Sequence, residues 1–126
     1  MIVGTGVDLC EVPRMKKAVE SVHGKRLVER VFTAREIAYA QRKAHPHERY
    51  AARFAAKEAG MKALGMGWRG GITWKDFEVV NLPSGRPTLK LTGRAAEVAQ
   101  KLGVVNIALS LTHTAEQAIA MVILEN

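Results

Sequence analysis

Alternation of β-branched and small residues opens the chain and predicts a strand over Ile2–Leu9. Val3, Thr5 and Val7 fall on one face of this strand, and the opposite face carries Ile2 with two glycines. We expect the strand to end near Asp8 and to be central and buried in a sheet. A charged residue at the end of a buried strand is a first candidate for function, because an apolar setting disfavours an unpaired carboxylate.

Helical spacing and capping residues predict a run of helices in the next fifty residues. Pro13 suits the first turn of a helix that continues to Glu20, and a short helix is expected at Lys25–Arg30. Thr33 and Glu36 form a capping-box pattern, with Phe32 as the preceding staple residue.

The longest helical signal starts at Pro46 or His47, is rich in alanine, and reaches about Leu64 before Gly65. After it the patterns predict, in order, a strand over Thr73–Val80, a turn at 83–85, a strand near Thr88–Leu91, a helix over Gly93–Leu102, and strands over Asn106–Thr112 and Gln117–Leu124. Both final strands are apolar on both faces, as buried strands are. We therefore predict a single α+β domain over residues 1–126, with a long central helix packed on an antiparallel sheet.

Composition excludes several classes of protein. The 126 residues are 48% hydrophobic and 25% charged with four prolines, which is typical of a folded domain and not of a disordered chain. No apolar run reaches the roughly 18–20 residues that span a bilayer, and the N-terminus lacks the basic region of a signal peptide. The single Cys10 allows no internal disulfide. These features predict a soluble, cytoplasmic protein with no membrane association.

The charge is concentrated near the N-terminus. Nineteen Lys and Arg against twelve Asp and Glu give a net charge of +7, and residues 14–43 hold nine of these bases and only three acids. Such a field favours encounter with an anionic partner, which could be a nucleic acid, a phosphorylated small molecule or an acidic protein. A solvated helical face would give the same pattern, so charge alone does not choose among them.

Two acidic residues stand out as candidates for chemistry. Asp8 ends the first strand, and Glu58 lies in an alanine-rich helix one turn before Lys62. One interpretation is a surface salt bridge between Glu58 and Lys62 with Asp8 as a turn residue. The other is a divalent cation flanked by phosphate-binding bases (Arg53, Lys57 and Lys62), since Mg²⁺ prefers few carboxylates and substrate phosphate oxygens.

Two further residues could contact an anion. His113 follows the last strand but one and is either a structural hydrogen-bonding group or a phosphate contact. Arg86 lies in a predicted turn and is free to reach an anion. The chain contains no P-loop, dinucleotide fingerprint or zinc-ligand spacing, so no sequence motif identifies a substrate. The residues themselves therefore predict no more than a Mg²⁺-dependent enzyme that acts on phosphates.

Taken in order, the motifs resemble the family of holo-acyl-carrier-protein synthases, the small bacterial 4′-phosphopantetheinyl transferases. The matching segments are Gly6–Asp8 with Glu11 and Arg14, Phe32–Thr33 with Glu36, Arg53–Ala59 with Lys62–Gly65, Gly85–Pro87, Ser110–Thr114 and Val122–Glu125. Gly60 and Met61 stand where a bulkier pair is common in the family.

This resemblance implies a reaction in which 4′-phosphopantetheine passes from coenzyme A to a serine of apo-acyl carrier protein, releasing adenosine 3′,5′-bisphosphate. It implies that Asp8 and Glu58 hold Mg²⁺ and that Lys62 contacts the same phosphate oxygens. Arg53, Arg86 and His113 are the other expected phosphate contacts, so the expected catalytic set is Glu58, Lys62 and His113. The general base is either Glu58 or a water held by the metal.

The resemblance also implies the partners. Relatives dock the acidic acyl carrier protein on the early helix, where this chain has Arg14, Met15 and Lys17. The family is typically a homotrimer with active sites at subunit junctions, and no nucleic acid takes part.

Two alternatives belong to other functional classes. A basic nucleic-acid-binding module would suit the isoelectric point near 9.9, but it leaves Asp8 and Glu58 unexplained and lacks the exposed aromatic residues of a single-strand binder. A structural assembly protein could instead use the two carboxylates at a subunit interface.

Overall fold

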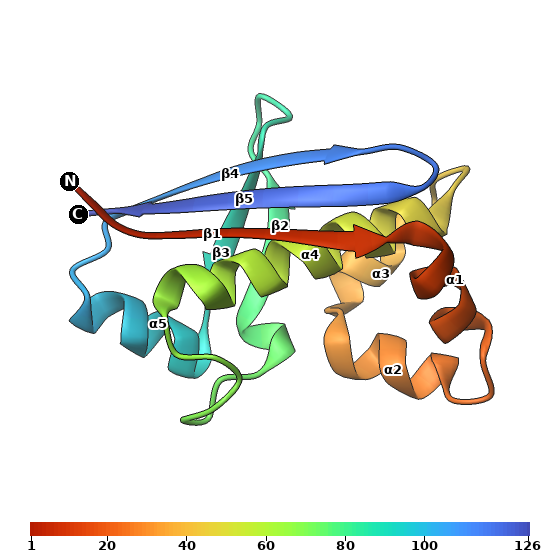
Figure 1. The fold of residues 1–126 in the computed structure, drawn as a ribbon, viewed down its shortest axis with the longest axis horizontal. Helices are drawn as coiled ribbons and strands as arrows, with labels where there is room; N and C mark the ends of the chain where they lie inside the picture. The colour runs from red at the N-terminus through yellow and green to blue at the C-terminus, as the bar shows by residue number, and fades with distance from the viewer.

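The computed structural model describes residues 1–126 and has five α-helices and two antiparallel sheets arranged around one long helix (Figure 1). In chain order the elements are β1 (Ile2–Glu11), α1 (Val12–Glu20), α2 (Gly24–Val31), α3 (Ala34–Gln41), α4 (Pro46–Leu64), the 3₁₀ turn η1 (Trp74–Asp76), β2 (Phe77–Asn81), β3 (Pro87–Leu91), α5 (Gly93–Lys101), β4 (Asn106–His113) and β5 (Gln117–Glu125). The predicted α+β class and the long central helix are confirmed.

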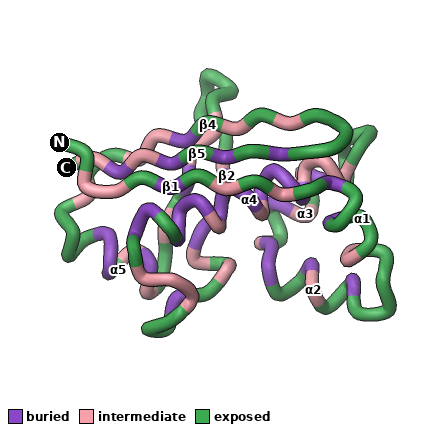
Figure 2. Tube along the Cα trace, in the orientation of Figure 1, coloured by how far each residue is buried: buried purple, intermediate pink, exposed green.

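The main sheet has the order β1–β5–β4, with α4 lying along one face. On β5 the residues that face α4 are buried small or aliphatic side chains: Ala118, Ala120, Val122 and Leu124. Figure 2 shows this burial along α4 and β5. The smaller β2–β3 hairpin and α5 complete the core, where Phe77 and Ala95 are fully buried.

Two glycines allow β1 to lie against the backbone of α4. A Cβ atom at Gly6 would overlap the carbonyl oxygen of Ala59, and one at Gly4 would overlap that of Ala63. The strand therefore comes closer to the helix than any side chain would permit. This approach brings Asp8, two residues beyond Gly6, to the side of α4.

A buried ion pair connects α3, α4 and β2. The capping box at Thr33 and Glu36 forms as predicted, and Glu36 also accepts a hydrogen bond from the Val79 backbone N–H at 2.9 Å. The Lys57 ammonium lies 2.8 Å from the Glu36 carboxylate, and both side chains are fully buried. Lys57 also donates to the carbonyl oxygens of Trp74 and Phe77. Burial lowers the pKa of Lys57 despite the attraction of Glu36.

Two predictions about the sheet are wrong. β1 is an edge strand rather than a central one, and its outward residues Val7 and Leu9 are 59% and 48% exposed. β5 is central, yet Ile119 and Met121 on its outer face are exposed as well. The physical reason is that α4 covers only one face of the sheet, so apolar composition on both faces does not indicate burial on both within one chain.

The strand predicted over residues 73–80 begins later than expected. Asp76 accepts hydrogen bonds from the Thr73 backbone N–H and hydroxyl, which closes a 3₁₀ turn, and β2 starts at Phe77. A local side-chain bond thus replaces ladder pairing over the first four residues.

The two ends of the chain lie together at one end of the main sheet (Figure 1). The Asn126 N–H donates to the Met1 carbonyl oxygen at 2.9 Å. None of the helices has the length and apolar content needed to cross a membrane.

Candidate functional site

The structure places Asp8 and Lys62 in direct contact between β1 and α4. Asp8 Oδ1 lies 2.7 Å from Lys62 Nζ, and Lys62 also donates to the Val7 carbonyl oxygen at 3.3 Å. The Asp8 side chain is 17% exposed and that of Lys62 is 49% exposed, so the pair lies at the edge of the sheet within reach of solvent. Lys62 is therefore paired with Asp8, and the alternative of a simple Glu58–Lys62 salt bridge is not what the structure contains.

Glu58 lies one turn before Lys62 on the same face of α4. Burial raises the pKa of the Glu58 carboxyl, and the negative charge of Asp8 raises it further; a hydrogen bond with Trp68 and the charge of Lys62 act in the opposite direction. The pKa of Lys62 is raised chiefly by its hydrogen bond to Asp8. The Asp8 and Glu58 carboxylates repel each other, and a cation bound between them would offset this repulsion.

The donor set fits one class of metal. No group of three or more His, Cys, Asp or Glu side chains is placed to hold a metal ion, so at this site Asp8 and Glu58 would supply two protein ligands. Mg²⁺ is commonly held by one or two carboxylates together with waters and substrate phosphates, whereas zinc and calcium sites use more protein ligands.

His113 lies at the other end of α4. Its Nδ1 is 3.2 Å from the Glu48 carboxylate and its Nε2 is 2.6 Å from the Arg49 guanidinium, so the arrangement has Nδ1–H donating to Glu48 and Nε2 accepting from Arg49. Ten helical residues separate Glu48 from Glu58, about 15 Å along the axis. Within one chain His113 is therefore remote from the acidic pair.

Arg49 is a candidate that the sequence did not reveal. It stands 64 positions from His113, and no spacing signal links the two residues. Only the packing of β4 beside the N-terminal turns of α4 brings them together. Both ring nitrogens of His113 are occupied in this arrangement, so the Arg49 guanidinium is the group here that can meet an anion.

The other two expected phosphate contacts also lie apart from Asp8. Arg53 is only 5% exposed, with its guanidinium stacked 3.9 Å from the centre of the Tyr39 ring, and burial lowers its pKa. Arg86 is exposed next to the turn that connects β2 and β3. The structure thus gathers Asp8, Glu58 and Lys62, and it leaves Arg53, Arg86 and His113 at three other places.

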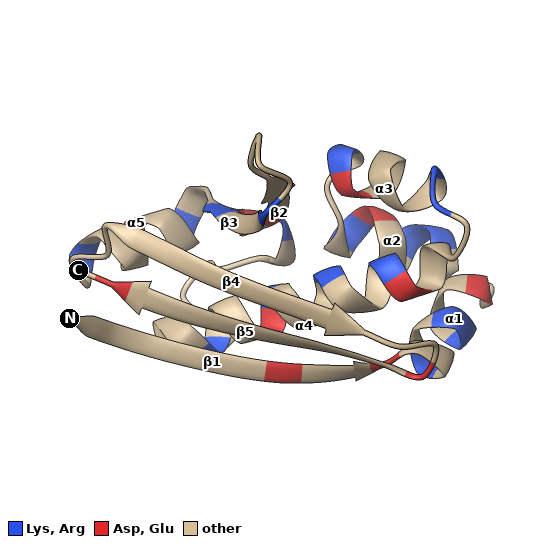
Figure 3. Ribbon diagram, turned by 90° about the horizontal axis from the view of Figure 1, so that it is seen from above, with Lys and Arg blue, Asp and Glu red and all other residues tan.

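The expected partner surface is on α1. Arg14 and Lys17 are exposed, while Met15 is 7% exposed and packs inward beside Phe32 and Phe54. Lys and Arg side chains gather over α1, α2 and α3 at one end of the molecule (Figure 3). This positive end adjoins the strand that carries Asp8.

Comparison with known proteins gives a consistent result over the whole chain. Residues 4–122 match the model of the 4′-phosphopantetheinyl transferase superfamily. The holo-[acyl-carrier-protein] synthase of Solibacter usitatus is 63% identical over 126 residues, which is 100% of both chains. Among solved structures, the enzyme of that name from Neisseria meningitidis is 28% identical with a TM-score of 0.88 over 100% of both chains. That from Helicobacter pylori, solved in complex with coenzyme A, is 26% identical with a TM-score of 0.82, covering 96% of this chain and 99% of the other. None of these comparisons supports a nucleic-acid-binding module.

Proposed function

The chain belongs to the holo-acyl-carrier-protein synthase family of 4′-phosphopantetheinyl transferases, and from this premise we propose that it transfers 4′-phosphopantetheine from coenzyme A to a serine of apo-acyl carrier protein. The serine oxygen attacks the β-phosphorus of coenzyme A, and adenosine 3′,5′-bisphosphate leaves. The observation that carries the proposal is the Asp8–Lys62 contact beside Glu58, because it places two carboxylates and an ammonium where a pyrophosphate and a cation could meet. Residues 1–126 would form one transferase domain working in the cytoplasm.

Asp8 and Glu58 would hold Mg²⁺. The donor set supports this, since burial and the negative charge of Asp8 raise the pKa of Glu58, and a bound cation would favour the ionised carboxylate. When bound, the metal supplies neutralisation of charge on the transferring and leaving phosphate oxygens.

Lys62 would bind the same phosphate oxygens. An ammonium has three N–H donors, and two of them are directed to Asp8 and to the Val7 carbonyl oxygen. One donor remains for substrate, and the bond to Asp8 fixes its direction. The serine proton would go either to Glu58, whose raised pKa brings it closer to neutral pH than an ordinary glutamate, or to a water molecule at the site.

Arg53, Arg86 and His113 would contact the remaining phosphates of coenzyme A. Their distance from the acidic pair within one chain supports a site completed by a second subunit. We propose a homotrimer in which the exposed outer face of the main sheet, with Val7, Leu9, Ile119 and Met121, forms the interface. An uncovered apolar face of this kind is typical of a surface that another protein covers.

Acyl carrier protein would dock on α1. Arg14 and Lys17 supply exposed positive charge for an acidic partner, and the buried Met15 side chain packs α1 against the rest of the protein. The position of α1 directly after β1 would bring the carrier serine toward Asp8.

Intact-mass spectrometry of an acidic apo-acyl carrier protein tests the reaction. After incubation with the chain, coenzyme A and Mg²⁺, we expect a mass gain of one phosphopantetheine group that is lost with EDTA and with Glu58→Gln. Glu97→Gln is the matched control, because Glu97 is an exposed glutamate of α5. No mass gain with any bacterial apo-carrier, despite coenzyme A binding, would contradict the proposal.

A further inference from the structure

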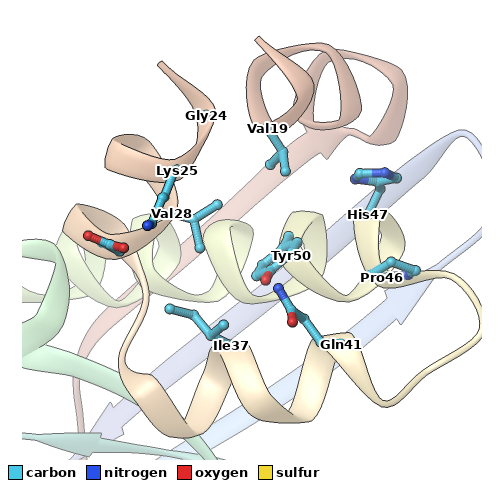
Figure 4. A pocket seen from close by; sticks show the side chains of 10 residues that line it. Val19, Gly24, Lys25, Val28, Ile37, Gln41, Pro46, His47 and Tyr50 are labelled. Atoms are coloured by element: carbon cyan, nitrogen blue, oxygen red, sulfur yellow. The ribbon is translucent and has the colours of Figure 1, made fainter. Parts of the chain in front are cut away.

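A pocket of about 630 Å³ lies among four helices, away from the acidic pair (Figure 4). Val19 of α1, Val28 of α2, Ile37 of α3 and Tyr50 of α4 contribute its apolar lining. None of the residues assigned above to the metal, to coenzyme A or to the carrier protein lines it. The volume lies within the roughly 300–1,000 Å³ that small-molecule sites occupy.

Tyr50 gives the pocket an unsatisfied polar group. Its side chain is only 2% exposed, and its buried hydroxyl has no hydrogen-bond partner. In Figure 4 this hydroxyl points toward the space between Ile37 and Gln41. Burying a hydroxyl without a partner is costly, so a ligand hydroxyl that reached Tyr50 from the pocket would supply a hydrogen bond that the chain does not.

His47 adds a second such atom, one turn before Tyr50 on the same face of α4. Its Nε2 lies 3.6 Å from the Glu20 carboxylate, whereas its Nδ1 is buried and has no partner. A neutral imidazole with its proton on the nitrogen facing Glu20 leaves Nδ1 as an acceptor. The pocket therefore offers one group that can donate or accept and one that accepts.

We propose that this pocket binds a small neutral amphiphile: an apolar body that carries a hydroxyl group. Aliphatic side chains would hold the body, and the ligand hydroxyl would hydrogen-bond with the Tyr50 hydroxyl, with His47 Nδ1 as a second acceptor beside it. A charged ligand fits less well, because Lys25 and Glu29 at the pocket carry opposite charges.

Titration with 4-propylphenol, followed by ¹H–¹⁵N correlation spectra of the full chain, tests this assignment. We expect saturable shifts confined to α1, α2, α3 and the first turns of α4. Ile37→Trp should abolish the binding by filling the pocket. Tyr50→Phe should weaken it about 2- to 10-fold by removing one hydrogen bond.

Two controls separate binding from damage to the fold. Without ligand, Tyr50→Phe should raise the melting temperature, because it removes an unsatisfied hydroxyl; a variant that binds less only because it unfolds would melt lower. Propylbenzene, which has the same apolar body but no hydroxyl, should bind more weakly than 4-propylphenol. The assignment is overturned if no saturable shift appears at millimolar 4-propylphenol, if propylbenzene binds equally well, or if Tyr50→Phe leaves the affinity unchanged.

Discussion

Glu58 holds a carboxylate where the folded chain disfavours its negative charge. Partial burial and the nearby Asp8 raise its pKa, and the hydrogen bond with Trp68 offsets only part of this. A residue used only for stability would not be placed in this way. The unfavourable ionisation of Glu58 in the metal-free protein is therefore a consequence of the arrangement that we propose binds Mg²⁺.

Replacing this carboxyl group should stabilise the metal-free protein in a pH-dependent way. The pKa of Glu58 is higher in the folded state than in the unfolded chain. The folded protein therefore loses stability as the pH rises from the unfolded pKa to the folded pKa of this carboxyl. Glu58→Gln should thus raise the melting temperature in EDTA at neutral pH and change it little below about pH 3, where both states are protonated. Thermal unfolding at both pH values measures this. An equal effect at the two values would contradict the electrostatic explanation.

Cys10 should be unusually unreactive. Burial, together with the charge of Asp8, raises the pKa of its thiol to about 11. Against an ordinary cysteine with a pKa of 9.0, the thiolate fraction at pH 8 is lower by about 90-fold, so alkylation by iodoacetamide should slow by a similar factor. Mass spectrometry over time measures the rate, with the urea-unfolded chain as the control; equal rates would show that the thiol is accessible and ionised.

At the residue scale, the sequence singled out the two acidic residues that the structure brings beside Lys62, but it did not reveal the contact between Arg49 and His113. Asp8 and Glu58 could be singled out because a carboxylate among apolar residues is unusual in any sequence. Arg49 could not, because its pairing with His113 depends on the packing of a strand against a distant helix. The partner of Lys62 is a residue 54 positions away, and helical spacing pointed instead to its neighbour Glu58.

At the scale of elements, the Glu36–Lys57 pair connects α3, α4 and β2, and its loss should be severe. Lys57→Met leaves a buried Glu36 without its counter-charge, and we expect a loss of about 3–5 kcal/mol in the free energy of unfolding. Lys75→Met is the matched control at an exposed lysine and should change little. Urea denaturation measures both variants, and a loss below about 1 kcal/mol for Lys57→Met would show that the pair is not a structural tie.

The close contact between β1 and α4 should be sensitive to a larger residue at Gly6. Gly6→Ala places a methyl group against the Ala59 carbonyl, so β1 must move away from α4. We expect a loss of about 1–3 kcal/mol, together with loss of transfer activity because Asp8 moves away from Lys62. Lys90→Ala, at an exposed position of β3 away from this contact, is the control. Full activity in folded Gly6→Ala would show that the close approach does not position Asp8.

Most elements could be predicted because their signals are local. The capping box at Thr33 and the glycine after Leu64 both fall where the structure has them. The start of β2 was missed because Asp76 forms a turn through its own side chain, a preference that competes with the strand pattern around it. The edge position of β1 depends on strand order, which no pattern within one strand encodes.

At the scale of the whole molecule, the uncovered outer face of the main sheet should determine assembly. Met121 lies in the middle of this face, paired with Val7 across the ladder. Met121→Glu should convert the proposed trimer to monomers and reduce transfer activity, since His113 and Arg86 could no longer reach a neighbouring acidic pair. Light scattering after size-exclusion chromatography measures the mass, with Lys101→Glu on α5 as the control. A wild-type chain that is already monomeric and active would refute the assembly.

The hydrogen bond between the first and last residues has a practical consequence. Because Met1 and Asn126 lie side by side, a short glycine–serine linker could join them without stretching either strand, and the chain could be reopened elsewhere. The exposed loop at Lys43 and Ala44, between α3 and α4, is a suitable opening point, because it lies outside the main sheet and holds none of the residues assigned to the site. In such a circular permutant the new ends would lie in this loop, and the strands joined by the linker would carry no free end.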